Sequence, residues 1–302
     1  MNVQKIDTFS GHRDCVYALT RAATESAFFS AGGDGQVVLW DLARPDVGTL
    51  VAQVPASVYA LAFDANKNQL WVGQNYEGIQ VIDPFQKTVV TSINITSAAI
   101  FDIQLFQNQA FIAQSDGVVT VMDVEHFAVK RHIKASTQSA RCLVVNSQKN
   151  EIAIGYSDHQ IRVFDIDNGN LKYVLDGHTN SVFTVQYSPD GRFLLSAGRD
   201  AHLRIWDAAA DYKPLKAIPA HLFAINHIVY SPDDQYFATC SMDKSIKIWS
   251  AATFQLLKVI DKARHAGHGT SINKLWWSAY NQQLVSASDD KKIAVWEVLK
   301  IQ

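Results

Sequence analysis

The sequence has few of the features that mark secreted, membrane or nucleic-acid-binding proteins. Its three cysteines, Cys15, Cys142 and Cys240, are odd in number and form no C-x-x-C pair. We therefore expect reduced thiols in a cytoplasmic protein and not a disulfide framework. The formal net charge is only −2, which gives no general basic surface for nucleic acid or an anionic membrane. The short basic run at 130–134 is predicted to be an exposed strand edge or turn.

Long apolar runs are also missing. No stretch of about 18 apolar residues could cross a bilayer, and the N-terminal residues lack a basic segment followed by an apolar core. We therefore expect neither a membrane span nor a secretory signal. The chain is 48% hydrophobic and 19% charged and has no long Pro, Gly or Ser tract, which is typical of a globular protein without flexible linkers.

What the sequence does contain is a repeated unit, clearest between Gly177 and Asp207. The unit opens on Gly-His, closes on Trp-Asp and holds three short runs predicted as strands. Between the first two runs, Ser188-Pro189-Asp190-Gly191 predicts a tight reversal, because Pro presets φ and Gly permits positive φ. A meander of this kind cannot bury both its faces alone, so it needs neighbouring units.

Copies of this unit recur along the whole chain. Strong copies end at Trp40-Asp41, Trp206-Asp207, Trp249-Ser250 and Trp296-Glu297, and weaker ones at Ile82-Asp83, Met122-Asp123 and Phe164-Asp165. Successive copies are 42, 40, 42, 42, 43 and 47 residues apart, the period of a four-stranded propeller blade. On these Gly-His and Trp-Asp pairs the chain resembles the WD40-repeat family. The resemblance implies an all-β protein, a seven-bladed β-propeller with four antiparallel strands per blade, in one domain covering residues 1–302.

The last repeat stops shortly after Trp296-Glu297 and so lacks an outermost strand. An alternating segment, Val3 to Phe9, runs into the first Gly-His and has no repeat of its own. We predict that this N-terminal strand, at about residues 3–9, completes the last blade and closes the ring, which removes open sheet edges. Lys262 to Gly267 is predicted to be a loop insertion before His268.

Four polar or aromatic side chains recur at matched positions in the regular repeats. The sets are His12, Ser30, Asp34, Trp40; His178, Ser196, Asp200, Trp206; His221, Thr239, Asp243, Trp249; and His268, Ser286, Asp290, Trp296. In the family these form a hydrogen-bonded chain from indole to carboxylate, and such a satisfied network rigidifies one geometry. The alternative is a nucleophilic Ser-His-Asp triad. A fourfold recurrence and the lack of a G-x-S-x-G elbow favour the structural interpretation, so we expect no catalytic residues.

Other candidate chemistry is weaker. Residues 165–170 partly match a calcium loop but lack its third oxygen ligand and closing Glu, so a hairpin turn is expected. Residues 32–35 are Gly-rich, but no Lys-Ser/Thr follows. His265 and His268 would bind a metal only if further ligands converged on them. We expect no cofactor and no metal.

The resemblance places a partner-binding surface on the top face of the propeller, around its central channel. One group of candidates follows the Val/Ile anchor of each first strand: Tyr17, Tyr59, Phe101, Arg141, Phe183, Asn226 and Asn273. A second group precedes the turn Asp and includes Arg199, Met242 and Asp289. Aromatic residues, Met and Arg are enriched in binding hot spots. The alternative is that the rings only plug the channel mouth.

The sequence therefore predicts a non-enzymatic, monomeric scaffold or adaptor that docks a protein or peptide. The alternative function is a propeller enzyme, or a small-ligand or metal binder, acting at the channel mouth. Inward carboxylates would favour that alternative, and the second group of candidates supplies only Asp289.

Overall fold

The unit between Gly177 and Asp207 forms the strands that its alternation predicts. They are β18 (Val182–Tyr187), β19 (Phe193–Gly198) and β20 (His202–Asp207), and β21 (Lys213–Pro219) adds a fourth. At the first reversal the Ser188 hydroxyl donates to Asp190 Oδ1 at 2.6 Å, and Gly191 adopts a φ of 66°. The sheet pairs in the order β18-β19-β20-β21 with antiparallel neighbours. Each unit is therefore a simple antiparallel meander.

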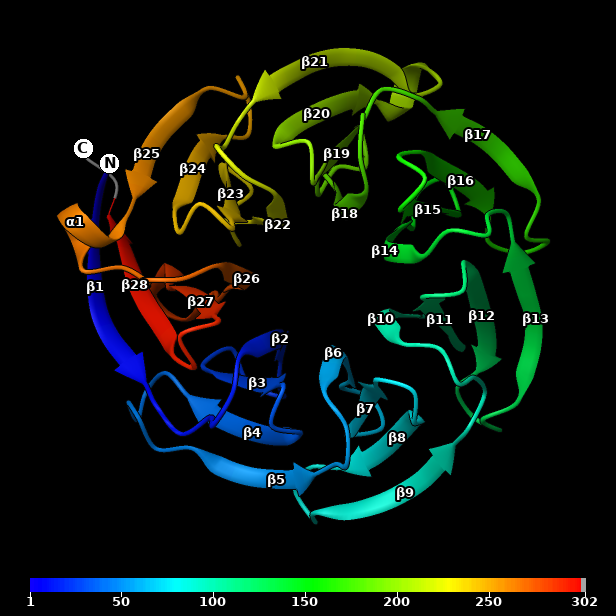
Figure 1. Ribbon diagram of the computed structural model, residues 1–302, viewed down its shortest axis with the longest axis horizontal. Coiled ribbons are helices and arrows are strands. Elements are labelled where there is room, and N and C mark those ends of the chain that lie inside the picture. Colours follow the sequence, from blue (N-terminus) through cyan, green and yellow to red (C-terminus); the bar gives the residue numbers. More distant parts are fainter. Residues whose placement is uncertain (300–302) are drawn as a thin grey trace.

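The computed structural model describes residues 1–299, and this part of the chain holds seven such four-stranded sheets in a closed ring (Figure 1). The innermost strands are β2 (Val16–Arg21), β6 (Val58–Asp64), β10 (Ile100–Phe106), β14 (Ala140–Asn146), β18, β22 (Ile225–Tyr230) and β26 (Ile272–Trp277). The second strands are β3 (Ala27–Gly32), β7 (Gln69–Gln74), β11 (Gln109–Gln114), β15 (Glu151–Tyr156), β19, β23 (Tyr236–Ser241) and β27 (Leu284–Ser288).

The outer half of each sheet is built in the same way. The third strands are β4 (Gln36–Asp41), β8 (Gly78–Asp83), β12 (Val118–Asp123), β16 (Ile161–Asp165), β20, β24 (Ile246–Ser250) and β28 (Ile293–Leu299). The outermost strands are β5 (Thr49–Gln53), β9 (Thr88–Ile93), β13 (Val129–Lys134), β17 (Leu171–Leu175), β21, β25 (Leu256–Ile260) and β1 (Asn2–Phe9). We number the sheets, or blades, one to seven from β2–β5 to the blade of β26–β28. The predicted all-β, seven-bladed fold is confirmed.

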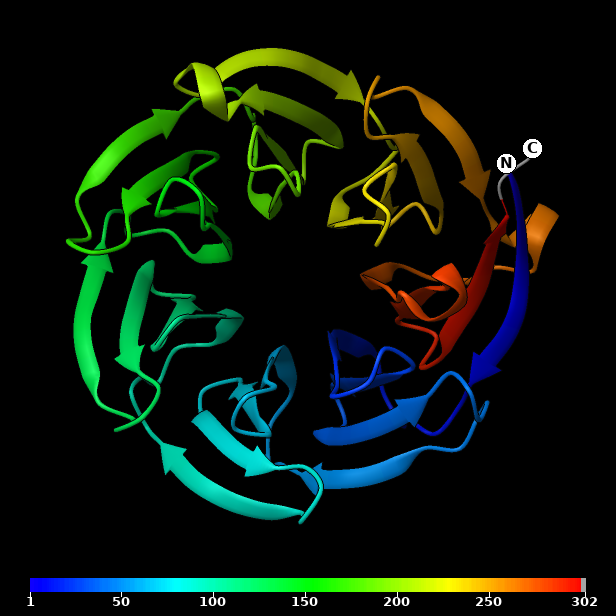
Figure 2. The ribbon, with the colours of Figure 1, turned by 180° about the vertical axis from the view of Figure 1, so that it is seen from behind.

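The ring closes through the N-terminal strand, as predicted. Blade seven pairs in the order β1-β28-β27-β26. Its register runs from Asn2 opposite Leu299 to Phe9 opposite Ile293, with one irregularity between Lys5 and Asp7. Seen from either side, the blue β1 lies along the red β28 at the outer edge (Figures 1 and 2). Strands from the two ends of the chain therefore share one sheet.

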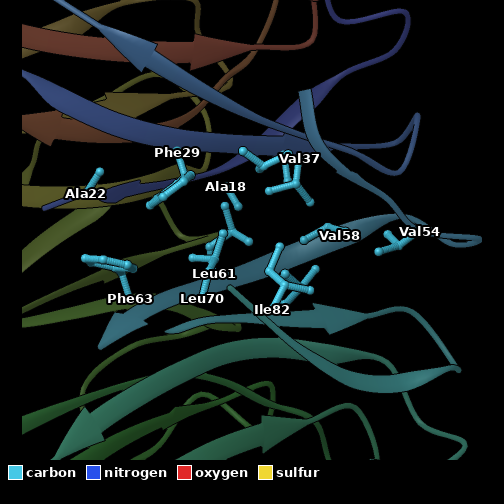
Figure 3. Close-up of a cluster of buried hydrophobic side chains, with 13 residues drawn as sticks. Ala18, Ala22, Phe29, Val37, Val54, Val58, Leu61, Phe63, Leu70 and Ile82 are labelled. Atoms are coloured by element: carbon cyan, nitrogen blue, oxygen red, sulfur yellow. The ribbon is translucent and has the colours of Figure 1, made fainter. Parts of the chain in front are cut away.

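The hydrophobic core is divided among the seams between blades. Among the described residues, seven clusters of buried side chains each join two neighbouring blades around the whole ring. In the cluster between blades one and two, Phe29 packs against Phe63 with ring centroids 5.4 Å apart (Figure 3). The closing strand takes part on both sides, because Val3 joins the seam with blade six and Phe9 the seam with blade one. A single blade thus has no complete core of its own.

Helical segments are short: α1 (Lys262–His265), η1 (Ala208–Ala210) and η2 (Tyr280–Gln282). The insertion predicted as a loop at 262–267 holds the one-turn helix α1, because the Asp261 carboxylate accepts the Arg264 N–H at 2.9 Å and caps it. No helix within residues 1–299 is long and apolar enough to span a bilayer.

Other local predictions hold. Residues 165–170 are the turn between β16 and β17, where Asp165 Oδ1 accepts the N–H groups of Asp167 and Asn168 at 3.0 and 3.1 Å. The basic run 130–134 lies in the outermost strand β13. All three cysteines are free thiols, with Cys142 and Cys240 buried.

Candidate functional site

Each innermost strand carries a β-bulge at the same place. The pairing register with the second strand skips one residue between Val16 and Ala18, and again between Val58 and Ala60. The remaining blades repeat the skip after Ile100, Ala140, Val182, Ile225 and Ile272. A bulge re-aims a side chain away from the regular pleat. The skipped residues, here called the rim, are Tyr17, Tyr59, Phe101, Arg141, Phe183, Asn226 and Asn273.

These seven rim residues are the first predicted group, and the structure brings them together. All of them line a cavity of about 300 Å³ in the central channel. Residues that follow the rim line it as well, because the bulge places two successive side chains on the channel. These belong to a second ring, made of Ala18, Ala60, Asp102, Cys142, Thr184, His227 and Lys274, of which the last five face this cavity.

The rim residues of blades one to five form a continuous arc of neighbouring aromatic rings and one guanidinium. The rings of Tyr17 and Tyr59 have centroids 4.8 Å apart, and Tyr59 lies 6.0 Å from Phe101. The guanidinium carbon of Arg141 lies 4.0 Å from the Phe101 ring centroid and 4.9 Å from that of Phe183. Arg141 is therefore held between two aromatic rings, an attractive cation–π arrangement.

The two asparagines of the rim tie neighbouring blades together instead. The Asn226 amide donates to the Ile272 carbonyl at 2.8 Å and the Ser271 hydroxyl at 3.1 Å. The Asn273 amide donates to the Val16 carbonyl at 3.0 Å and to Asp289 Oδ1 at 2.8 Å. These amides are engaged in holding blades six, seven and one together, so they have less capacity left for a ligand.

The second ring is polar on the side of blades three to seven, and sequence analysis did not single it out. Asp102 Oδ2 accepts the Leu143 N–H at 3.0 Å, and the Thr184 hydroxyl accepts the Ile228 N–H at 3.2 Å. A signal was present, since these residues directly follow the rim positions and differ from the alanines of blades one and two.

Burial shapes the charges around this cavity. Burial raises the pKa of the Asp102 carboxyl, although Lys274 and the N–H groups of Leu143 and Ile103 oppose the shift. Burial, and to a smaller extent the positive charge of Lys274, hold the pKa of His227 well below its usual value. This imidazole is therefore neutral at pH 7. Burial also lowers the pKa of Arg141, though a guanidinium stays charged at neutral pH. The cavity is thus lined by two cations, Arg141 and Lys274, and by the Asp102 carboxyl group, which ionises less readily than usual.

The three candidates of the second group lie outside this cavity. We call top face the side that carries the loops between blades and the turns between second and third strands. Arg199 and Met242 are exposed there, at the turns of blades five and six. Asp289 is bound to Asn273 beside the rim. The structure thus separates a channel mouth from a surrounding surface.

Two large apolar residues of the top face were missed by sequence reasoning. Leu222 is 83% exposed and Phe223 is 62% exposed, and Met242, at 51%, belongs to the neighbouring turn. The signal was the residue pair after each repeat histidine, which is Arg13-Asp14, Thr179-Asn180 or Gly269-Thr270 in the other regular repeats but Leu222-Phe223 in repeat six. We call Leu222, Phe223 and Met242 the blade-six patch.

The recurrent polar sets form the expected hydrogen-bonded chains. In blade five the Trp206 indole N–H donates to the Ser196 hydroxyl at 2.9 Å, and His178 Nε2 lies 2.8 Å from that hydroxyl. His178 Nδ1 lies 2.9 Å from Asp200 Oδ2. Blades one, six and seven repeat this chain.

The Asp carboxylate that ends each hydrogen-bonded chain also fixes two loops of the top face. In blade six, Asp243 accepts two backbone hydrogen bonds. The Leu222 N–H, in the loop between blades, donates at 3.1 Å, and the Ser245 N–H, in the turn between the second and third strands, donates at 3.0 Å. Ser30, Ser196, Thr239 and Ser286 are 0% exposed. A buried hydroxyl already bound to indole and imidazole cannot reach a substrate, so these sets hold the loops.

Two of the degenerate blades use other polar links in the same region. In blade three, Gln114 donates to the Thr120 hydroxyl at 2.7 Å, and His132 Nδ1 lies 3.0 Å from it. In blade four, the Ser136 hydroxyl donates to Asp158 at 2.6 Å, and Arg162 pairs with the same carboxylate at 2.9 Å. Within residues 1–299 no three His, Cys, Asp or Glu side chains gather in a way that could hold a metal ion.

Comparisons with known proteins agree with this architecture. A WD domain, G-beta repeat model matches residues 3–41, 169–207, 212–250 and 260–297, the four regular repeats. Striatin-3 of Mus musculus is 24% identical over 247 residues, which cover 68% of this chain and 29% of striatin-3. Protein groucho of Drosophila melanogaster is 23% identical over 217 residues, 69% of this chain and 29% of groucho. The chain spans less than a third of the length of these two relatives.

A solved structure matches the complete ring. The WD40 β-propeller domain of Doa1 superimposes with a TM-score of 0.86 at 19% identity, covering 99% of this chain and 98% of that domain. At this identity the likeness concerns the fold. The family model covers half of the sequence, and the chain belongs to the WD40 repeat family.

Proposed function

We propose that the protein is a non-enzymatic docking module that binds a protein or peptide partner on the top face of its propeller. The observation that carries the proposal is the blade-six patch. Solvent-exposed side chains as large as Leu222 and Phe223 in adjacent positions are a feature of interaction sites when they gather with further apolar surface. Met242 provides that further surface.

The backbone beneath the patch is held in place. The Met242 N–H donates to the Ala224 carbonyl at 3.0 Å, and the Ser241 hydroxyl donates to the Phe223 carbonyl at 3.1 Å. Together with the Leu222 N–H bond to Asp243, these contacts fix both segments that carry the patch. A preorganised surface loses less conformational entropy on binding, which favours affinity.

The charged residues beside the patch suggest which charges the partner segment carries next to its apolar anchor. Arg199 and Lys244 are exposed on the neighbouring turns, and neither side chain forms an ion pair within residues 1–299. The nearby carboxylates of Asp200 and Asp243 are already bound to histidines. We infer a partner segment with an apolar anchor and acidic residues near it, because opposite charges steer association.

The test compares wild-type protein with Leu222→Ser/Phe223→Ser. A partner captured by crosslinking in cells is purified, and its Kd is measured for both proteins. We expect the double variant to bind at least about tenfold more weakly, since central apolar anchors each cost about 1–2 kcal/mol when removed. Phe85→Ser, which removes a 51% exposed phenylalanine on the opposite side of the ring, serves as the matched control and keeps wild-type affinity.

Wild-type affinity in a folded double variant would show that the blade-six patch is not the docking site. The rim aromatics stay part of the proposed surface, and replacing Tyr17, Tyr59, Phe101 and Phe183 by Ala tests them in the same assay. The monomeric state and the cytoplasmic location stay predictions, to be measured by light scattering and by imaging.

A further inference from the structure

We propose that the channel mouth is a binding site for a small carboxylic acid, held by Arg141 and Lys274 inside the rim. This site is separate from partner docking on the blade-six patch and does not depend on it. The carboxylate group pairs with the Arg141 guanidinium, and a hydroxyl or amino group of the same molecule donates to Asp102. The expected ligand class is therefore a small hydroxy or amino acid.

The first observation is the state of Arg141. Its guanidinium lies over the rings of Phe101 and Phe183, which hold it in position. Despite this, its N–H groups form no hydrogen bond and no ion pair with any other residue of the described part, 1–299. A guanidinium presents its donors as a planar fork that matches the two oxygens of a carboxylate. Arg141 thus has the orientation for such a ligand and lacks an internal acceptor.

The second observation is Lys274, which lines the same cavity. The Lys274 ammonium has no hydrogen-bond acceptor and no carboxylate within 4.0 Å among residues 1–299. Its neighbours on the second ring behave differently, since Asp102, Thr184 and His227 each accept a backbone N–H from the next blade. Lys274 is the cation of this ring, and its positive charge lowers the pKa of both Asp102 and His227.

The charge of the cavity follows from these groups. Arg141 and Lys274 contribute two positive charges, Asp102 contributes at most one negative charge, and His227 is neutral. The lining therefore has a positive excess that one carboxylate would balance. A phosphate, with a charge of about −1.5 to −2, fits less well, because Asp102 would repel it.

The space and the lining suit a molecule of this size. The cavity of about 300 Å³ is bordered by Tyr17 and Tyr59, whose rings offer apolar surface to the body of the ligand. A second cavity, of about 580 Å³, continues along the channel and shares Asp102, His227 and Lys274 with the first. The polar groups thus lie inside the channel, behind the aromatic rim.

The experiment uses three compounds of nearly equal shape: 3-phenyllactate, 3-phenylpropionate, which lacks the hydroxyl, and 3-phenyllactamide, which lacks the charge. Binding to the full chain is titrated by calorimetry and by the side-chain NMR signals of arginine. We expect 3-phenyllactate to bind one-to-one with a Kd of about 1 mM or tighter. 3-Phenylpropionate should bind more weakly, and 3-phenyllactamide should lose at least about tenfold.

Two channel variants test the residues. Arg141→Lys keeps the charge but removes the fork, and Lys274→Gln removes the charge, so each should weaken 3-phenyllactate binding at least about tenfold. Lys213→Gln, at an exposed position of β21 outside the cavity and away from the blade-six patch, is the matched control and should bind like wild type. If Arg141→Lys does not fold, Lys274→Gln alone decides. Equal binding of the amide, tighter binding of inorganic phosphate, or wild-type affinity in a folded channel variant would overturn the proposal.

Discussion

At the scale of single residues, the polar sets define where each proton lies. The indole N–H of Trp206 donates to the Ser196 hydroxyl, which donates to His178 Nε2, and His178 Nδ1–H donates to Asp200. This direction needs a neutral imidazole, and burial does lower the pKa of His178, against the opposing effect of Asp200. Burial would raise the pKa of Asp200, but the bonds from His178, Thr179 and His202 outweigh it and hold this pKa at about 2.

Asp200→Ala tests the structural role of the set. The change leaves His178 Nδ1–H and the Thr179 N–H without their acceptor, and we expect the free energy of unfolding to fall by about 1–3 kcal/mol. Urea denaturation followed by circular dichroism measures it. Glu77→Ala, at an exposed position on the top face, is the control and should change stability by less than about 0.5 kcal/mol. An unchanged midpoint for Asp200→Ala would contradict a structural role.

At the scale of elements, the bulge in each innermost strand explains why the rim could be predicted only in part. The position after an apolar anchor identified the seven rim residues, because that anchor is Val or Ile in six blades and Ala140 in blade four. Sequence alone did not indicate that the extra residue brings its successor to the channel as well, which is how Asp102, His227 and Lys274 entered the cavity lining. Contacts such as Arg141 between two rings come from separate blades, so no local pattern encodes them.

Deletion of residues 1–9 tests the closing strand. The deletion removes β1, exposes the outer edge of β28 and takes Val3 and Phe9 out of two seams. We expect a sharply lower melting temperature and aggregation, since an open edge pairs with other chains. Differential scanning calorimetry and light scattering measure both effects.

A synthetic peptide of residues 1–10 provides the control for this deletion. Added in excess to the shortened protein, it should restore part of the melting temperature by occupying the vacant edge. Unchanged melting of the shortened protein itself would argue against closure by this strand.

At the scale of the whole molecule, sequence predicted the number of blades and the ring closure but not the surface. The period of Trp-Asp or its substitutes was enough for the ring, because each substitute, such as Met122 or Phe164, is apolar and buried. Leu222 and Phe223 were overlooked since apolar residues in a strand-rich chain are usually core, and only their exposure showed otherwise. Exposure depends on the packing of all neighbouring loops and has no short sequence signature.

Acidification should destabilise the ring as a whole. Burial lowers the pKa of His12, His178, His221 and His227 below the ordinary 6.5, so below that pH the unfolded chain takes up protons that the folded chain does not. Each such proton costs about 1.4 kcal/mol of stability per pH unit. Asp200 acts in the same direction at lower pH, because its folded pKa of about 2 lies below the unfolded value. Stability therefore falls as the pH drops below 6.5.

The free energy of unfolding, measured by urea at pH 7.5 and 5.5 and constant ionic strength, should fall by at least about 1 kcal/mol. His178→Asn is the control and should show a smaller slope with pH. Equal or greater stability at pH 5.5 would refute this account of the histidines.

The shared last blade also bears on how the protein is made. Among the described strands, the ribosome synthesises β1 first and its partner β28 last. At about 5–20 residues per second, roughly 15–60 seconds separate the two. Throughout that interval the nascent chain carries an unpaired strand and an unfinished ring, so the closing step must wait until β28 has been synthesised.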